Sequence, residues 1–275
     1  MDYVELNIPI SESEMREIIT AELADYPFES FSEQGGQLKA YIPQERLADC
    51  MEEVDELLAR YSISGARYIS IETQNWNQQW ESNFEQVEVG REILIRAPFH
   101  APNSEFRTEV VIMPKMSFGT GHHATTYLMS EMITKIDVKG KRGLDMGSGT
   151  GVLAIIAVKY GAEAVDAIDI DEWAYENCQE NIAVNGAEEC VTPMWGGVSL
   201  LEGSSYDFIL ANINRNILLA DMSSYIATLA KGGTLLMSGF FVEDIAILRD
   251  KAESLGLTYV GFSEREGWAV MQLTR

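Results

Sequence analysis

The sequence predicts an α/β protein in which a Rossmann-like sheet, ending in an antiparallel hairpin, follows a small α+β domain. Three observations lead to this prediction. A glycine-rich turn, Gly143 to Gly151 (GLDMGSGTG), joins an apolar strand to an apolar helix. The next strand, Ala164 to Asp171, ends in acidic residues about 20 positions after the glycines. The N-terminal residues follow the order strand, helix, strand, strand, helix, strand. We therefore expect residues 1–73 as one domain, 74–90 as a helical linker and 91–275 as the Rossmann-like domain.

The N-terminal domain is predicted to be ferredoxin-like, because the order βαββαβ is that of this fold. The pattern Ser11-x-x-Glu14 is a capping box that begins the first helix. The pair Gly35-Gly36 marks a hairpin between the two middle strands. Alternating or helical apolar spacing gives the elements, which are Tyr3 to Ile8, a helix through Ala24, Phe28 to Glu33, Gln37 to Ile42, Gln44 to Tyr61 and Arg67 to Ile71.

Charge is unevenly distributed along the chain. The net charge is −23, and residues 1–71 alone hold 15 acidic and 5 basic side chains. Such a surface repels phosphate backbones and the 20 basic residues are scattered, so we expect no direct nucleic-acid binding. The acidity indicates either general solubility or a basic protein partner.

Composition also bears on the compartment and on metals. The longest apolar run covers residues 152–158, which is too short to span a bilayer, and the start MDYVELNIPI shows no signal peptide. The three cysteines, Cys50, Cys178 and Cys190, form no C-x-x-C, which favours a cytoplasmic location and argues against structural zinc. Only three histidines are present, so we expect no metal centre.

The linker and the strands after it are predicted from composition. Residues 74–90 (QNWNQQWESNFEQVEVG) place Trp76, Trp80 and Phe84 at intervals of four, which indicates a short polar helix with one aromatic stripe that packs against a neighbouring part of the protein. Ile93 to Arg96 and Thr108 to Met113 follow as two strands.

The glycine turn is the first candidate site. Gly147, Gly149 and Gly151 permit backbone angles that side chains forbid, and they allow a ligand to lie against bare main chain at a helix N-terminus. A nicotinamide-binding turn would need glycine where this chain has Val152. Asp145 completes the pattern Asp-x-Gly-x-Gly-x-Gly, which resembles the first motif of S-adenosylmethionine-dependent methyltransferases. An acid there suits a ligand that carries an ammonium and a sulfonium.

Two acids end the next strand, and we assign them different roles. Asp169 lies where an acid binds both hydroxyls of a ribose. Asp171 is predicted to be the N-cap of the helix from Trp173 to Val184.

Two further segments are expected near this site. The polar loop FGTGHHATT, Phe118 to Thr126, precedes the glycine-turn strand. Tyr206 to Ala211 is a buried strand that ends at Asn212, and the carboxyl ends of parallel strands form the ligand crevice of such sheets. The remaining elements are predicted as helix 216–230, strand Thr234 to Ser238, helix 242–254 and the strands Thr258 to Phe262 and Trp268 to Leu273.

Taken together, WNQQWESNF, FGTGHHATT, GLDMGSGTGVLAI, AIDIDEWA and LANIN resemble the bacterial ribosomal protein L11 methyltransferase family. The resemblance covers the chain from about Trp76 onward and implies a seven-stranded class I methyltransferase domain. It also implies that S-adenosylmethionine methylates lysine side chains and the N-terminal amino group of the ribosomal protein, which the N-terminal domain binds.

Carried over by position, the resemblance assigns cofactor contacts to Thr126, Gly147, Asp169 and Asn212. Asn212, with a neighbouring main-chain carbonyl, is expected to orient the amine, which must be neutral to have a lone pair. His123 or His122 is a candidate to take its proton, and bulk water is the alternative.

Two other functions are compatible with parts of the pattern. Glutamine methyltransferases of release factors use Asn-Pro-Pro-Tyr after the fourth strand, whereas this chain has Asn212-Ile213-Asn214-Arg215. A non-catalytic factor that binds the ribosomal protein would not need Asp145, Gly147, Asp169 and Asn212 together.

Overall fold

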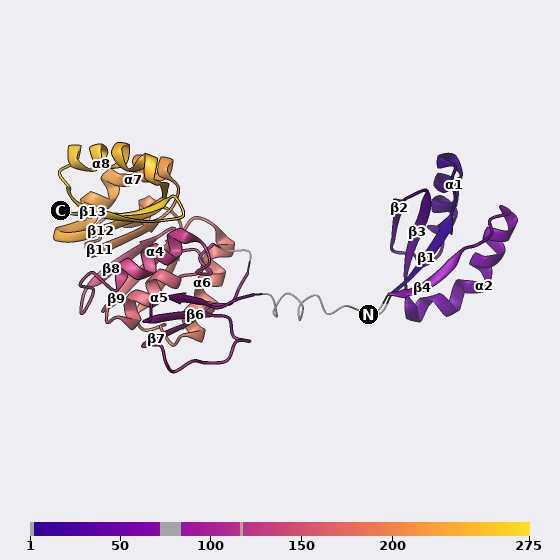
Figure 1. Ribbon diagram of the computed structural model, residues 1–275, viewed down its shortest axis with the longest axis horizontal. Coiled ribbons are helices and arrows are strands. Elements are labelled where there is room, and N and C mark those ends of the chain that lie inside the picture. Colours follow the sequence, from indigo (N-terminus) through magenta and orange to yellow (C-terminus); the bar gives the residue numbers. More distant parts are fainter. Residues whose placement is uncertain (1–2, 72–83, 116–117) are drawn as a thin grey trace. The chain divides into compact units, whose positions relative to one another are not determined.

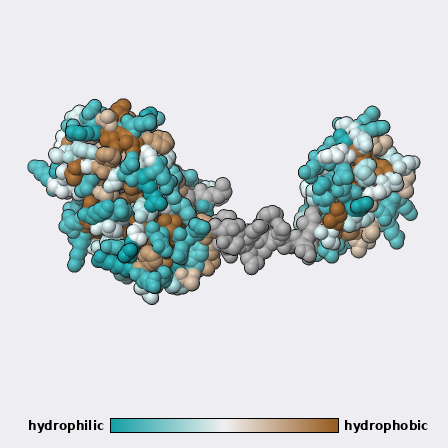
Figure 2. Space-filling view, in the orientation of Figure 1, coloured by the Kyte–Doolittle hydropathy of each residue, from teal (hydrophilic) through white to brown (hydrophobic). Residues whose placement is uncertain are grey.

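The computed structural model describes residues 3–71, 84–115 and 118–275 (Figure 1). The chain forms two compact units, Met1–Asn83 and Phe84–Arg275, here called the N-terminal and C-terminal units. On the faces shown in Figure 2, hydrophilic residues cover most of each unit and hydrophobic residues lie in small groups. Residues 74–83 of the predicted linker, with Trp76 and Trp80, lie outside the described residues.

The N-terminal unit has the predicted ferredoxin-like order. Its four strands pair antiparallel in the order β2-β3-β1-β4, and one core contains residues from the strands and both helices. The elements are β1 (Tyr3–Pro9), α1 (Ser13–Leu23), β2 (Ser30–Gln34), β3 (Gln37–Pro43), α2 (Gln44–Arg60) and β4 (Arg67–Ile71).

The capping box predicted at Ser11 is wrong. Helix α1 begins at Ser13 with Glu12 as N-cap, and no side chain caps it. The guanidinium of Arg16 instead donates to the carbonyl oxygens of Ile10 and Ser11, at 2.9 and 3.0 Å. A long-range ion pair of Arg16 with Glu33 helps to fix that arrangement.

The C-terminal unit contains the predicted seven-stranded sheet, in the order β10-β9-β8-β11-β12-β14-β13. The first five strands pair in parallel, and β14 pairs antiparallel with both β12 and β13. The strands are β8 (Arg142–Met146), β9 (Ala164–Asp169), β10 (Val191–Trp195), β11 (Tyr206–Asn212), β12 (Leu229–Phe241), β13 (Thr258–Arg265) and β14 (Trp268–Thr274).

Helices cover both faces of this sheet. Successive strand residues point to opposite faces, so Leu210 joins one apolar core and Ile209 joins the other. Helices α4 (Ala124–Ile133), α5 (Val152–Lys159) and α6 (Glu172–Val184) contribute to the first core. Helices α7 (Arg215–Thr228) and α8 (Ile245–Ser254) contribute to the second.

The C-terminal unit differs from the sequence-based expectations in several details. Strand β10 was not predicted; it contains Pro193, which is tolerated because β10 is an edge strand. The predicted helix 216–230 ends at Thr228, where β12 begins. Residues 87–89 form strand β5 (Val87–Val89), although the sequence assigned them to the helical linker, because they pair with β6 (Ile93–Arg96).

Strands β5 and β6 belong to a separate small sheet. The strand β7 (Thr108–Val111) pairs in parallel with β6, which gives the order β5-β6-β7. Ile93, Ile95 and Val110 are buried in the same core as α4 and α5. The small sheet thus covers part of that face of the C-terminal unit.

Candidate functional site

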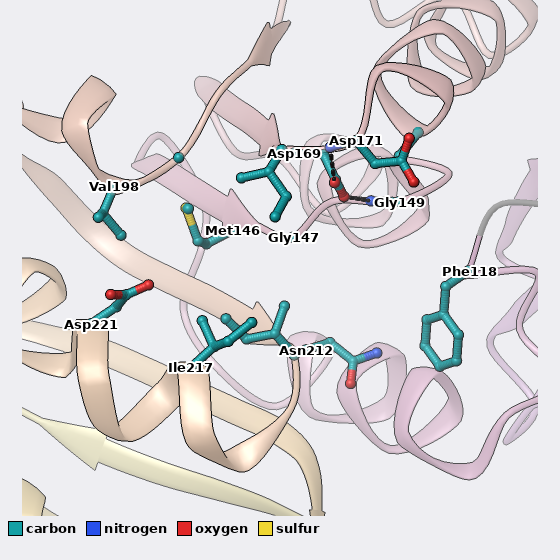
Figure 3. Close-up of a pocket in the computed structure, with 14 residues that line it drawn as sticks. Phe118, Met146, Gly147, Gly149, Asp169, Asp171, Val198, Asn212, Ile217 and Asp221 are labelled. Atoms are coloured by element: carbon teal, nitrogen blue, oxygen red, sulfur yellow. Dashed lines mark hydrogen bonds between the residues drawn. The ribbon is translucent and has the colours of Figure 1, made fainter.

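A cavity of about 640 Å³ opens where three neighbouring parallel strands end. Met146, Asp169 and Asn212 are the last residues of β8, β9 and β11, and all three line it (Figure 3). We call it the main cavity; its other lining residues are Phe118, Gly147, Gly149, Ile170, Asp171, Ala174, Gly197, Val198, Ile213, Ile217 and Asp221.

The glycine turn borders the main cavity because side chains are absent there. Gly147 and Gly149 have φ values of 73° and 54°, in the left-handed region. A Cβ atom on Gly147 would lie 2.1 Å from Ile213 Cγ2, and one on Gly149 would lie 2.2 Å from the Phe118 carbonyl oxygen. Gly151 does not line the cavity; it is the N-cap of α5 and packs against Cys178.

Asp169 is connected to the glycine turn. Its Oδ2 accepts a hydrogen bond from the Gly149 N–H at 2.9 Å, and its Oδ1 accepts from the Asp171 N–H at 3.0 Å. Asp171 caps α6 as predicted, since its Oδ1 accepts from the Trp173 N–H at 3.0 Å. Both carboxylates line the main cavity (Figure 3).

Asp145 has a different environment from the other acids of the site. Its side chain is fully buried, lies outside the lining of the main cavity and accepts from the Ala154 N–H of α5 through Oδ2 at 3.1 Å. Its Oδ1 has no hydrogen-bond partner among the described residues. Burial is the main cause that raises the pKa of this carboxyl to about 7; the hydrogen bond from Ala154 opposes the shift and the nearby charge of Asp169 adds to it.

Asn212 joins the main cavity to a second one. Its Nδ2 donates to Thr126 Oγ1 at 3.5 Å, the upper limit for a hydrogen bond. Its Oδ1 is buried and has no partner among the described residues. A buried amide oxygen without a partner is costly, so it marks a place where a donor from outside the chain can bind.

The second cavity, here called the side cavity, has a volume of about 260 Å³. It shares Phe118, Asn212 and Ile213 with the main cavity. Its remaining lining residues are His123, Thr125, Asn214, Gly239 and Trp268. The two cavities are therefore neighbours at Asn212, the residue whose Oδ1 has no partner among the described residues.

Aromatic rings form a wall of the side cavity. The ring of His123 lies 5.1 Å from Phe118 and 4.7 Å from Trp268, centroid to centroid, and Trp268 lies 4.1 Å from Phe241. His123 also caps α4, because its Nδ1 accepts from the Thr125 N–H at 3.3 Å. The same Nδ1 lies 2.8 Å from the Thr125 hydroxyl oxygen, so this ring nitrogen is engaged at the start of α4.

Two other residues singled out in the sequence line neither cavity. Thr126 is fully buried in the first turn of α4 and reaches the site only through its contact with Asn212. His122 lies beside the carbonyl oxygen of Glu85 and the hydroxyl of Thr120, at 2.9 and 3.1 Å.

Several cavity residues were not found by sequence reasoning. Ile217 and Asp221 line the main cavity from α7, and their spacing of four on one helix face was a signal that was not used. Phe118 begins the polar loop Phe118 to Thr126, and a hydrogen bond from the Thr150 N–H to its carbonyl oxygen, at 3.0 Å, holds it at the site. Trp268 comes from the last strand and had no local signal.

Within residues 3–71, 84–115 and 118–275, no group of three or more His, Cys, Asp or Glu side chains could hold a metal ion. None of the helices in that part of the chain combines the length and the apolar character that a bilayer span needs.

Comparison with known proteins identifies similar chains. Residues 7–275 match the family model described as Ribosomal protein L11 methyltransferase (PrmA). A ribosomal protein L11 methyltransferase of Porphyromonas gingivalis is 44% identical over 263 residues, which cover 94% of this chain and 90% of that protein. One of Phocaeicola vulgatus is 40% identical and covers 99% of both chains. The crystal structure of a ribosomal protein L11 methylase from Lactobacillus delbrueckii subsp. bulgaricus shares the fold, with a TM-score of 0.63 and 24% identity over 70% of this chain and 99% of that one.

Proposed function

The chain belongs to the ribosomal protein L11 methyltransferase family, and from this premise we propose that it transfers methyl groups from S-adenosylmethionine to lysine side chains and the N-terminal amino group of ribosomal protein L11. The observation that carries the proposal is the unpartnered Oδ1 of Asn212 at the junction of the two cavities. An amine that enters the side cavity would donate to this oxygen while it faces a ligand in the main cavity.

The residues of the main cavity fit this cofactor. Its volume of about 640 Å³ is in the range of small-molecule sites. The bare main chain of Gly147 and Gly149 suits the amino-acid end, and the Asp169 carboxylate suits the ribose hydroxyls. When bound, the cofactor supplies an electrophilic methyl group on a positively charged sulfur.

The side cavity would orient the acceptor amine. Only a neutral amine has the lone pair that attacks the methyl group, and enclosure by Phe118, His123 and Trp268 disfavours the charged form by removing water. Asn212 Oδ1 accepts an amine hydrogen and so aims the lone pair along the line of transfer. Fixing two reactants in this way supplies much of the rate of a transfer reaction.

Removal of the amine proton needs no dedicated base in this arrangement. Nδ1 of His123 is engaged by both the N–H and the hydroxyl of Thr125, at 3.3 and 2.8 Å. The side chain is thus placed as a cavity wall and helix cap. Bulk water takes the proton from the substrate ammonium before the neutral amine enters the side cavity.

The N-terminal unit, predicted as residues 1–73, is assigned to substrate recognition, with residues 74–90 as the connection. Residues 1–71 carry 15 acidic and 5 basic side chains, which complement a lysine-rich ribosomal protein. The same acidity argues against direct binding of nucleic acid. The described cysteines are free, which fits the reducing cytoplasm.

The two alternatives explain the observations less well. Release-factor glutamine methyltransferases use prolines and tyrosine directly after the asparagine, whereas this chain has Ile213-Asn214-Arg215 there. A non-catalytic binding factor would have no use for two cavities that meet at an unpartnered amide oxygen.

The test combines binding and turnover. Calorimetry should detect S-adenosylmethionine binding to the full chain, and mass spectrometry should detect added methyl groups on ribosomal protein L11. The variant Asn212→Ala serves as the control, because it should still bind S-adenosylmethionine but methylate ribosomal protein L11 slowly. Absence of cofactor binding would reject the enzyme, and binding without methylation of this protein would reject the substrate.

A further inference from the structure

The main cavity has a charged end that the proposed function does not use. In Figure 3, Asp221 of α7 lies at the opposite end of the drawn residues from Phe118, with Val198 above it and Ile217 beside it. Asp221 and Ile217 are four residues apart and therefore lie on the same face of α7.

Asp221 differs from the other two carboxylates that line the main cavity. Asp169 accepts hydrogen bonds from two main-chain N–H groups, and Asp171 caps α6. Asp221 makes no hydrogen bond or ion pair with any of the described residues. Tyr225, one turn further along α7, has a buried hydroxyl that also lacks a partner, so it does not hold this carboxylate. Arg215, the other charged residue of α7, pairs with Asp244 instead.

The chemistry of the ligand decides what this carboxylate can bind. S-Adenosylmethionine presents hydrogen-bond donors at three places, which are its ammonium, its ribose hydroxyls and the exocyclic amine of adenine. The methyl group has to face Asn212, where the cavities meet, and Asp169 is the acceptor suited to the ribose. The donor left for the end near Asp221 is the adenine amine, and the apolar side chains of Ile170, Val198 and Ile217 suit a flat aromatic base.

We propose that the Asp221 carboxylate accepts a hydrogen bond from the exocyclic amine of adenine and thereby selects the adenosyl group of the cofactor. The inference rests on the proposed function, since it assigns one end of the same cavity. A carboxylate there also disfavours a purine with an oxygen at that position, because two acceptors would face each other.

The experiment is calorimetry of the full chain with two product analogues, S-adenosylhomocysteine and S-inosylhomocysteine, which differ at the purine position in question. The unsubstituted protein should bind the adenosyl compound at least about tenfold more tightly, as expected for a hydrogen bond to a charged acceptor. Asp221→Leu, which has no acceptor, should weaken the adenosyl compound by about tenfold and leave the inosyl compound unchanged or tighter. Asp221→Asn can donate to the oxygen that the inosyl compound carries in place of the adenine amine. This variant should bind the adenosyl and inosyl compounds with affinities within about threefold of each other.

Controls separate this inference from its premise. Asp250→Asn makes the same charge change on an exposed residue of α8 and should keep the original preference. Equal weakening of both compounds by the Asp221 substitutions, or no change in either, would overturn the assignment to the adenine amine. If the unsubstituted protein binds neither compound, the proposed function itself fails. Asp221→Asn decides the matter if Asp221→Leu does not fold, as judged by circular dichroism.

Discussion

Asp169 at the end of β9 accepts a hydrogen bond from the Gly149 N–H at 2.9 Å, so its carboxylate connects β9 to the glycine turn. A second bond, from the Asp171 N–H, reaches the other oxygen at 3.0 Å. The carboxylate is thus fixed in position before any ligand arrives, and it still lines the main cavity. A fixed acceptor loses little conformational entropy when a ribose binds.

The first prediction concerns this carboxylate. Asp169→Ala should weaken S-adenosylmethionine binding by roughly 1–3 kcal/mol, because hydrogen bonds to a charged acceptor are lost. Calorimetry measures the effect. Unchanged affinity would contradict the ribose assignment and shift it to Asp171.

The second prediction concerns the unpartnered amide of Asn212. Asn212→Ala should lower the rate of methyl transfer more than it weakens cofactor binding, because its Oδ1 is assigned to the amine. Single-turnover kinetics with ribosomal protein L11, combined with calorimetry, separates the two effects. An unaltered single-turnover rate would rule the role out.

The third prediction tests whether His123 acts as a base. Asn can also cap a helix, so His123→Asn should preserve α4 and reduce turnover only slightly. Loss of a general base typically costs a factor of about 10² to 10⁴. A fall of that size, together with loss of the corresponding limb of the pH–rate profile, would show that His123 takes the amine proton.

The fourth prediction concerns the buried carboxyl of Asp145. Its pKa is raised to about 7 in the folded chain from an ordinary value of 3.8, so the folded state holds a proton that the unfolded state releases. The contribution of this carboxyl to the free energy of unfolding is complete below about pH 4, and it is lost as the pH rises towards 7. Asp145→Asn removes this pH dependence. The free energy of unfolding of the variant, minus that of the unsubstituted protein, should therefore rise by roughly 2 kcal/mol from pH 5 to pH 8.

Urea unfolding of both proteins at the two pH values measures this difference. A relative stability that does not change with pH would mean that the Asp145 carboxyl is ionised in the folded protein. Asp250→Asn, an exposed substitution, is the matched control and should show no such dependence.

The fifth prediction concerns the division of labour between the two units. A chain that begins near Gln74 should bind S-adenosylmethionine with near-native affinity, since every residue that lines the main cavity lies beyond position 117. It should lose most methylation of ribosomal protein L11. Activity of the full chain on this protein should fall as ionic strength rises, because exposed charges are screened. Normal methylation by the truncated chain would show that the N-terminal unit does not bind the substrate.

Much of the fold follows from patterns that are local in the sequence. Alternating residues in Tyr3–Pro9 and the apolar runs of β8, β9 and β11 predicted strands that the structure contains. Asp171 was predicted as an N-cap because capping involves residues only two or three positions apart. The positions of Gly147, Asp169 and Asn212 at one edge of the sheet follow from the rule that parallel strands end together.

Other features depended on contacts between distant parts of the chain. Trp268 and Asp221 reach the cavities only because β14 and α7 pack where they do. Strand β10 stayed hidden because its proline is acceptable only at an edge, and the capping box at Ser11 failed because α1 begins at Ser13 with Glu12 as its N-cap.

The sequence by itself determined most of the element order, the glycine turn and the strand-ending acids, since each depends on near-neighbour backbone geometry. Tertiary structure alone decided which way those side chains face. It buried Asp145 against α5, so that the acid of the glycine motif lies outside the cavity lining, and it left the oxygen of Asn212 without a partner where two cavities meet. The physical reason is that burial and hydrogen-bond satisfaction are set by what packs around a side chain, and that packing comes from strands and helices far apart in the sequence.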